Sequence, residues 1–262
     1  MSGLLAIDIG NTHIKIGLYR DGGWVEEWRL ATDMRRTPDE YRLFVRGLLL
    51  ESHIDAVDRA VVASVVPLLT PFFLRVLESV SLSPPTEVVP PGYGLEVDYP
   101  PENLGADRFV NALAAWQLTH RAVVVVDVGT TATVDAVVDG VYLGGAIAPG
   151  PHFLTQALAE GTARLPHVNP VIEPWGIGKN TEQAIRAGVG QGFVSMVRGL
   201  IEDTRRVIGS DAEIILTGGW SQRLEPYLRI PARLELRLTL EGLRYADQWL
   251  TTQSYPSSHA RS

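Results

Sequence analysis

Ala6–Thr12 has the sequence AIDIGNT, and Val125–Thr131, which lies 119 positions later (127 minus 8), has the sequence VVDVGTT. Each copy is an apolar run that ends at Asp-x-Gly and continues with Asn or Thr and then Thr. A single Asp-x-Gly turn is common, so chance similarity is the alternative explanation. Two copies about half a chain apart, in matching surroundings, instead favour two lobes of related structure.

The segments after each copy alternate apolar and polar residues, which is typical of strands, so each lobe is expected to open with a three-strand meander. The expected turns within the meanders are Asp21-Gly22-Gly23 and Asp139-Gly140. The predicted strands are 4–9, 13–19, 24–30, 59–65, 122–128, 132–138, 142–148 and 213–217. Helical spacing of apolar residues predicts helices at 38–51, 71–80, 106–118, 181–208 and 240–250. Segment 83–101 is rich in proline and glycine and is expected to be irregular, and Pro149-Gly150-Pro151 is expected to break the chain.

The repeat divides the chain into an expected N-terminal lobe at 1–117, a C-terminal lobe at 118–250 and a polar, disordered tail at 251–262. The long predicted helix has an apolar stripe that serves either as core or as an interface between subunits. That stripe consists of Val189, Phe193, Met196, Val197 and Leu200.

Composition limits the possible functions. A chain of 262 residues with a formal charge of −7 lacks the basic character of nucleic-acid-binding proteins. The absence of cysteine excludes disulfides and thiolate metal sites. Met1–Ile9 does not resemble a signal peptide, and the longest apolar run, Ala122–Val126, is too short to span a membrane. We therefore expect a cytoplasmic protein that associates with neither membrane nor nucleic acid.

The first copy has the residues of a phosphate-binding turn. A glycine at the corner, Gly10, allows an anion to approach the backbone N–H groups, and Asn11 and Thr12 add side-chain donors. Lys15 either adds a positive charge to this site or is an ordinary exposed strand lysine. Asp8 either holds Mg²⁺, directly or through water, or makes a local turn contact.

Other nucleotide and metal motifs are absent from the sequence. Gly176–Asn180 (GIGKN) has the wrong spacing for a Gly-x-x-x-x-Gly-Lys-[Ser/Thr] loop, and Asn follows its lysine. Gly188–Gly192 (GVGQG) lies in a predicted helix, so it favours close helix packing over a dinucleotide loop. The six histidines are scattered and form no zinc-binding pair.

Seven segments in order across residues 4–250 together resemble a known family. They are DIGNTHIKIG (8–17), SVVP (64–67), GADRFVN (105–111), DVGTTATVD (127–135), GGAIAPG (144–150), GKNT (178–181) and LEGL (240–243). The combination is similar to type III pantothenate kinases, which belong to the acetate-kinase/sugar-kinase/heat-shock-protein-70/actin superfamily. The resemblance implies an α/β fold of two ribonuclease-H-like (actin/hexokinase-like) lobes. Each lobe would have a mixed sheet flanked by helices, with a cleft between the lobes where the two glycine turns face each other across a triphosphate.

The resemblance also implies roles for particular residues. Asp107 would be the catalytic base, and Asp127 would bind a monovalent cation, K⁺ or NH₄⁺. The residues implied to contact ATP are Asp8, Ile9, Gly10, Asn11, Thr12, His13, Ile14, Lys15 and Thr130. The residues implied to contact pantothenate are Tyr99, Gly105, Ala106, Asp107, Arg108 and Thr181, although Tyr99 is one residue short of the family spacing.

Ordinary structural roles compete with several of these. Asp107 could be an acid favoured at a helix N-terminus, Arg108 could pair with a neighbouring carboxylate, and Asp127 could stabilise a turn. Leu216-Thr217-Gly218-Gly219 either resembles the superfamily's adenosine-side glycine pair or is a simple strand-end turn.

The implied activity is ATP- and Mg²⁺-dependent phosphorylation of pantothenate to 4′-phosphopantothenate, the first step of coenzyme A biosynthesis, by a homodimer. Two alternatives stay open. One is a kinase of the same superfamily that acts on another small hydroxyl or carboxyl substrate, and the other is a non-catalytic nucleotide-binding regulator.

Overall fold

The structure is a computed structural model that describes residues 3–253. The chain divides into two compact units, the first made of residues 1–117 and 238–262 and the second of residues 118–237. The expected second lobe at 118–250 therefore differs from the observed division, because the last helix, α7 (Leu238–Gln253), belongs to the first unit. Residues 251–253 of the expected tail end this helix, and the rest of that tail lies outside the described residues.

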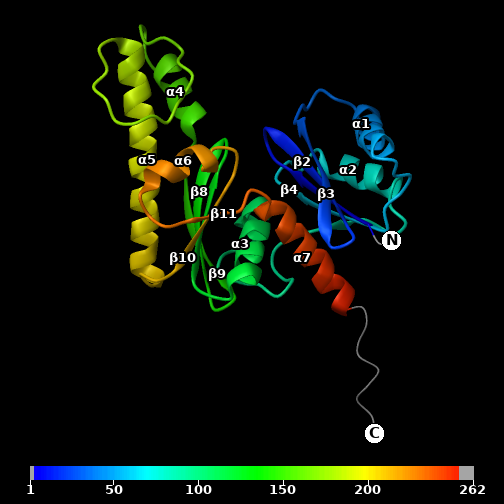
Figure 1. Ribbon diagram of the computed structural model, residues 1–262. Coiled ribbons are helices and arrows are strands. Elements are labelled where there is room, and N and C mark those ends of the chain that lie inside the picture. The colour runs from blue at the N-terminus through cyan, green and yellow to red at the C-terminus, as the bar shows by residue number, and fades with distance from the viewer. Residues whose placement is uncertain (1–2, 254–262) are drawn as a thin grey trace. The chain divides into compact units, whose positions relative to one another are not determined.

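The first unit contains a sheet with the strand order β3-β2-β1-β4-β5 (Figure 1). The strands β1, β2 and β3 form an antiparallel meander, and β4 and β5 continue the sheet in parallel. The bounds are β1 (Gly3–Ile9), β2 (His13–Arg20), β3 (Gly23–Ala31), β4 (Arg59–Ser64) and β5 (Thr86–Glu87). The unit also contains a short strand, β6 (Glu96–Val97), and a 3₁₀ turn, η1 (Pro101–Asn103).

Helices cover both faces of this first sheet. On one face, α1 (Pro38–Glu51) and α2 (Thr70–Glu78) pack with Leu5, Ile7 and Ile9 of β1 in a common core. α7 contacts β1 and β4 on the other face, where Leu240 lies over Gly17. α3 (Ala106–Thr119) crosses α7 closely, because Gly242 has no side chain to meet the backbone of Val110.

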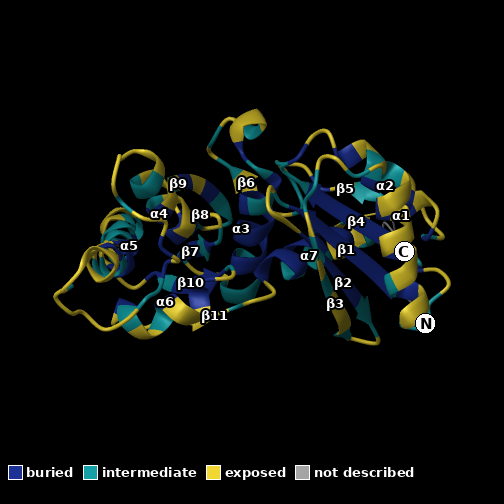
Figure 2. Cartoon of the chain, turned by 90° about the horizontal axis from the view of Figure 1, so that it is seen from above, coloured by how far each residue is buried: buried dark blue, intermediate teal, exposed yellow. Residues whose placement is uncertain are grey.

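The second unit contains strands in the order β11-β10-β7-β8-β9. The strands β7, β8 and β9 form an antiparallel meander, whereas β10 and β11 run parallel to their neighbours. The bounds are β7 (Val123–Val128), β8 (Thr131–Val138), β9 (Val141–Pro149), β10 (Glu213–Thr217) and β11 (Arg233–Leu234). The helices are α4 (Pro151–Glu160), α5 (Thr181–Ile208) and α6 (Ser221–Leu228). Figure 2 shows the central strands of both sheets in dark blue, which marks buried residues.

The two meanders repeat each other in detail. Both hairpins between the second and third strands turn at Asp-Gly with positive φ at both residues: 53° and 85° at Asp21 and Gly22, and 49° and 78° at Asp139 and Gly140. These values are typical of the type I′ turn, whose twist matches that of the strands it joins. The sequence repeat is therefore a structural repeat of strand, glycine turn, strand, Asp-Gly turn and strand.

The two glycine turns differ in length by one residue. In the first unit Ile9 pairs with Ile14, and the N–H of Gly10 donates to the carbonyl of His13 (3.0 Å). In the second unit Val128 pairs with Ala132, and the N–H of Gly129 donates to the carbonyl of Thr131 (2.8 Å). The shorter turn shifts the register of the following strand, so Lys15 lies opposite Asp8 whereas Thr133 lies opposite Asp127.

The main predicted elements are confirmed, with α1 and α5 matching at both ends. α1 begins where it does because Thr37 and Glu40 form a reciprocal capping box. The sequence prediction missed α4 and α6. Pro149-Gly150-Pro151 does not simply break the chain, since Gly150 is the N-cap of α4 and Pro151 is its first residue.

The long helix α5 uses its apolar stripe mainly as core. Phe193 and Val197 are buried in the main core of the second unit, against which Met196 and Leu200 pack, while Val189 is buried in a smaller cluster with Val168 and Ile185. In residues 3–253 no helix combines the length and apolar character that a membrane crossing needs.

Candidate active site

The first glycine turn presents its polar side chains to solvent. Asn11, Thr12 and His13 are exposed, while Asp8, at the end of β1, is only 5% exposed. Thr32, which directly follows β3, stabilises the turn. Its hydroxyl donates to the carbonyl of Gly10 (2.6 Å), and its N–H donates to the carbonyl of Thr12 (3.0 Å). The turn therefore offers exposed donors on a backbone that the neighbouring strand stabilises.

Lys15 lies opposite Asp8 and forms an ion pair with it, with 3.4 Å between Nζ and Oδ2. The same ammonium donates to Oγ1 of Thr239 in the first turn of α7 (3.4 Å). The Lys15 side chain is 28% exposed, so it is not the freely solvated strand lysine of the alternative interpretation. Sequence patterns gave no indication of Thr239, because its contact depends on α7 returning to the first sheet.

His13 follows the turn at the start of β2. Although His13 is largely exposed, partial desolvation of its imidazole, together with the positive charges of Arg29 and Lys15, lowers the pKa of His13 below its ordinary value. The lowered pKa favours the neutral imidazole at pH 7.

Asp107 lies in the first turn of α3, and its carboxylate folds back over the residue before the helix. Its Oδ1 accepts a hydrogen bond of 2.7 Å from the N–H of Arg108 and lies 2.6 Å from the position that a Cβ on Gly105 would occupy. Glycine at residue 105 therefore leaves the space that the carboxylate fills. Arg108 itself is 7% exposed.

This helix start and the glycine turn lie at the same end of the first sheet. The side chain of Val65, just after β4, is 3.5 Å from the Cβ position of Gly105, and the N–H of Val65 donates to the carbonyl of Ile9 (3.0 Å). Because β1 and β4 are parallel, their carboxyl ends share one edge. The structure thus brings Asp8, Gly10 and Asp107 to one edge of the first unit.

Tyr99 is a half-buried residue of the loop between β6 and η1. A second tyrosine, Tyr93, was not singled out from the sequence. Its ring centroid lies 6.0 Å from that of Phe109 in α3 and 5.8 Å from that of Trp249, and burial raises the pKa of its hydroxyl. Tyr93 therefore supports the helix that carries Asp107.

The second glycine turn adjoins the start of α4. The N–H of Gly150 donates to the carbonyl of Thr130 (3.1 Å), and a side chain at residue 150 would collide with the carbonyls of Thr130 and Gly129. Thr130 is exposed. The positive end of the α4 dipole is therefore next to the turn that was predicted to contact ATP.

Asp127, at the end of β7, contacts the turn that follows β10. Gly218 has φ of +90°, and a Cβ there would collide with Oδ1 of Asp127 and lie 2.5 Å from the carbonyl oxygen of Val128. Thr217, which precedes it, pairs with Asp127 in the parallel ladder and is fully buried. The Leu216–Gly219 segment is thus a neighbour of Asp127, a relationship that the sequence did not indicate.

Thr181 is the first residue of α5, in the second unit, and is exposed. Asn180 is the N-cap, with its side chain accepting a hydrogen bond from the N–H of Gln183 (2.9 Å). A side chain at Gly178 would collide with the backbone of Ala184. The GKNT segment therefore fixes the start of this helix, which accounts for its residue types independently of any ligand.

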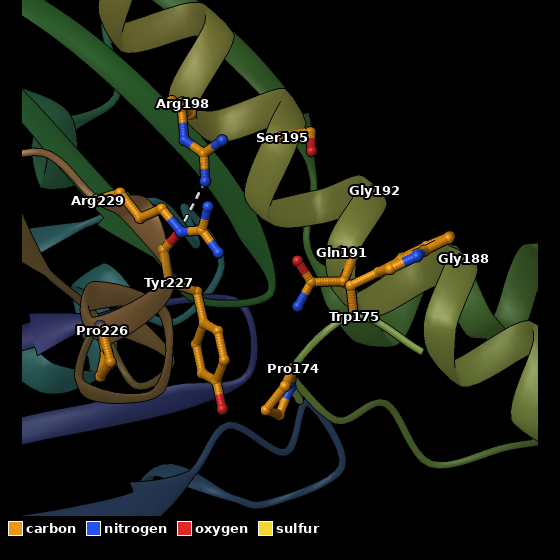
Figure 3. A pocket seen from close by; sticks show the side chains of 10 residues that line it. All are labelled: Pro174, Trp175, Gly188, Gln191, Gly192, Ser195, Arg198, Pro226, Tyr227 and Arg229. Carbon is orange, nitrogen blue, oxygen red and sulfur yellow. Dashed lines mark hydrogen bonds between the residues drawn. The ribbon is translucent and has the colours of Figure 1, made fainter. Parts of the chain in front are cut away.

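A cavity of about 690 Å³ lies in the second unit between α5, α6 and the loop before α5 (Figure 3). Its lining includes Trp175, Gln191 and Tyr227, together with Arg198, whose Nη2 donates to the carbonyl of Tyr227 (2.7 Å). None of the residues predicted to contact ATP, pantothenate or a cation lines this cavity. The described residues also include no group of three or more His, Asp or Glu side chains arranged to hold a metal ion.

Solved structures that resemble this chain show the fold. A Campylobacter jejuni protein described as a conserved putative Baf family transcriptional activator aligns with a TM-score of 0.64 at 20% identity, over 95% of this chain and 99% of that one. A putative 2-dehydro-3-deoxygalactonokinase from Sinorhizobium meliloti aligns with a TM-score of 0.59 at 12% identity, over 98% and 100%. The chain therefore has a two-lobed, ribonuclease-H-like α/β fold of the kind found in actin and sugar kinases.

Sequence comparison identifies the family within that class. A family model described as type III pantothenate kinase matches residues 4–203. The type III pantothenate kinase of Moorella thermoacetica is 39% identical over 92% of this chain and 97% of its own length. That of Myxococcus xanthus is 38% identical over 92% and 96%. The chain belongs to the type III pantothenate kinase family.

Proposed function

We propose that this chain transfers the γ-phosphoryl group of ATP to the primary hydroxyl of pantothenate, giving 4′-phosphopantothenate for coenzyme A biosynthesis. The observation that carries the proposal is the position of the Asp107 carboxylate. It is fixed at the start of α3 by Gly105 and the N–H of Arg108, at the sheet edge that also holds the Gly10 turn. Family membership supplies the identity of the acceptor.

In this proposal Asp107 orients the acceptor hydroxyl and takes its proton. Phosphoryl transfer has a loose transition state, so alignment and charge neutralisation contribute more than the strength of the base. An ordinary carboxylate is therefore adequate at this position. The residues that would line the pantothenate pocket with it are Tyr99, Gly105, Ala106, Arg108 and Thr181.

The first turn, Asp8–Lys15, would contact the phosphates of ATP through exposed donors at Asn11 and Thr12, and Thr130 would contact ATP from the second unit. Mg²⁺ on the phosphates would supply the positive charge that the transferring group needs. Lys15 already partly neutralises Asp8, and this favours a role for Asp8 through a water molecule over direct Mg²⁺ ligation. Asp127 would hold K⁺ or NH₄⁺.

A homodimer in the cytoplasm is part of the same proposal and rests on the family resemblance. Sedimentation velocity of the purified chain measures directly whether it is a dimer. A monomer at micromolar concentration would remove the dimer from the proposal without affecting the assignment of the chemistry.

The experiment that tests the activity is a coupled ADP-release assay of the full chain with pantothenate, sugars and acetate, each with and without K⁺. We expect ADP release with pantothenate as the acceptor and none with the sugars or acetate. Turnover only with a sugar or acetate would identify another kinase of the superfamily. ATP binding without ADP release for any acceptor would identify a nucleotide-dependent regulator.

A further inference from the structure

The hydroxyl of Thr217 is buried and lacks a hydrogen-bond partner among residues 3–253. Thr217 ends β10 with an exposed fraction of 0%, and its Oγ1 reaches no donor or acceptor. The hydroxyl of Ser221, which is equally buried, donates to the carbonyl of Gly218 (2.7 Å). Because buried polar atoms in folded proteins are almost always satisfied, the free oxygen of Thr217 indicates that a further group binds beside it.

The carboxylate of Asp127 belongs to the in-register neighbour of Thr217 on β7. Thr217 and Asp127 are direct neighbours in the parallel ladder between β10 and β7, where adjacent strands are about 4.8 Å apart. Their sequence neighbours Leu216 and Val126 both point into the core of the second unit. Thr217 and Asp127 therefore both point to the opposite face of the sheet.

A carboxylate and a neutral hydroxyl side by side form a donor set of low charge made only of oxygen. Such a set suits a weakly charged, hard cation, since neutral oxygens replace the hydration shell of K⁺ in proteins. A divalent ion would favour more carboxylates, and the described residues contain no such cluster.

We propose that Oγ1 of Thr217 is a direct ligand of the monovalent cation assigned above to Asp127. This inference rests on the proposed cation site and extends it, because the family resemblance implied Asp127 alone. The cation would join the carboxyl ends of β7 and β10, so its binding should stabilise the folded second unit as well as support activity.

The test is K⁺ titration of thermal unfolding for the full chain, at constant ionic strength with Na⁺ as the replacement. We expect K⁺ to raise the unfolding temperature of the wild type, and Thr217→Val to raise the K⁺ concentration at the midpoint roughly tenfold or more. Thr217→Ser, which keeps the oxygen, should titrate like the wild type. In Na⁺ alone Thr217→Val should unfold at the same temperature as the wild type or higher, because it removes an unsatisfied buried hydroxyl.

Thr155→Val is the matched control. Its hydroxyl is also buried in the second unit, but it donates to the carbonyl of His152 (3.0 Å). This variant should lower the unfolding temperature equally in both salts and leave the K⁺ midpoint unchanged. A Thr217→Val variant that titrates with K⁺ like the wild type overturns the inference.

Two further outcomes separate the inference from the proposed function. A wild type that ignores K⁺ but phosphorylates pantothenate would overturn the cation site and this ligand together, while the kinase assignment stands. If Thr217→Val does not fold, crystals of the wild type soaked in Rb⁺ provide the test through anomalous scattering. A Rb⁺ peak in contact with both Asp127 and Thr217 supports the inference, and a peak that contacts Asp127 without Thr217 overturns it.

Discussion

Gly218 and Asp127 are in contact at the ends of two parallel strands, and a Cβ on Gly218 would overlap Oδ1 of Asp127. Gly218 also has φ of +90°, which disfavours any residue with a side chain. We predict that Gly218→Ala lowers the free energy of unfolding by about 1–3 kcal/mol, through strain and the displaced carboxylate. Urea denaturation of the purified variant measures this change.

The neighbouring glycine provides a matched control for that substitution. Gly219 has no atom within 4 Å of its Cβ position and does not have positive φ. Gly219→Ala should therefore stay within about 0.5 kcal/mol of the wild type. Equal destabilisation by both substitutions would mean that contact with Asp127 is not the reason for glycine at residue 218.

Asp107→Asn tests the catalytic base. Asparagine keeps an oxygen that can accept the hydrogen bond from the N–H of Arg108, so the start of α3 should persist. We expect kcat for pantothenate to fall by roughly 10²–10⁴-fold, the usual contribution of a general base, with an unchanged unfolding temperature. Asp55→Asn, at an exposed loop position, is the control and should retain full turnover. Near-normal kcat for Asp107→Asn would remove this residue from the base role.

Lys15 is predicted to act on ATP. Its ammonium lies 3.4 Å from both Asp8 and Thr239, and these two contacts are long for charge-assisted hydrogen bonds. Lys15→Met should raise KM for ATP about tenfold, which corresponds to one charge-assisted contact of ~1.4 kcal/mol. Lys15→Arg, which keeps the charge, should recover most of the affinity in steady-state assays. If Lys15→Met changes stability alone, then Lys15 serves only to balance the charge of Asp8.

The sequence predicted the repeat because both copies follow the same local rules. Apolar strands, glycine corners and Asp-Gly turns depend on residues close together in the chain. The first residues of α1, α3 and α5 were predicted correctly from helical spacing, whereas α2 and α7 begin one and two residues before their predicted starts. The strands and helix that carry Asp8, Asp107 and Asp127 were therefore predicted from the sequence.

Contacts between residues far apart in the chain could not be predicted from these local rules. α7 was assigned to the second lobe because it follows that lobe in sequence, yet its packing on β1 and β4 places it in the first unit. The contacts of Thr239 with Lys15 and of Gly218 with Asp127 join residues 224 and 91 positions apart in the chain (239 minus 15 and 218 minus 127). Periodicity and turn chemistry carry no information about such pairs.

Replacement of K⁺ by Na⁺ tests the cation proposal at the level of activity. A fixed positive charge near the transferring phosphoryl group should be worth at least ~1.4 kcal/mol, so kcat/KM is expected to fall roughly tenfold or more. NH₄⁺ should substitute for K⁺. In Asp127→Asn the residual activity should no longer depend on the choice of cation, and wild-type activity that is indifferent to the exchange would contradict the site.

His13 predicts how the stability of the folded chain depends on pH. Partial desolvation of its imidazole, with smaller effects from Arg29 and Lys15, lowers its pKa in the folded state below the ordinary value near 6.5 that it has when unfolded. The unfolded state then binds the proton more readily, so the contribution of His13 is present above pH 6.5 and is lost as the pH falls through the folded-state pKa. We expect the unfolding free energy of the wild type to decrease from pH 7 to pH 5, and His13→Gln to decrease less over the same range. Parallel curves for the two proteins would show that His13 is not the group responsible.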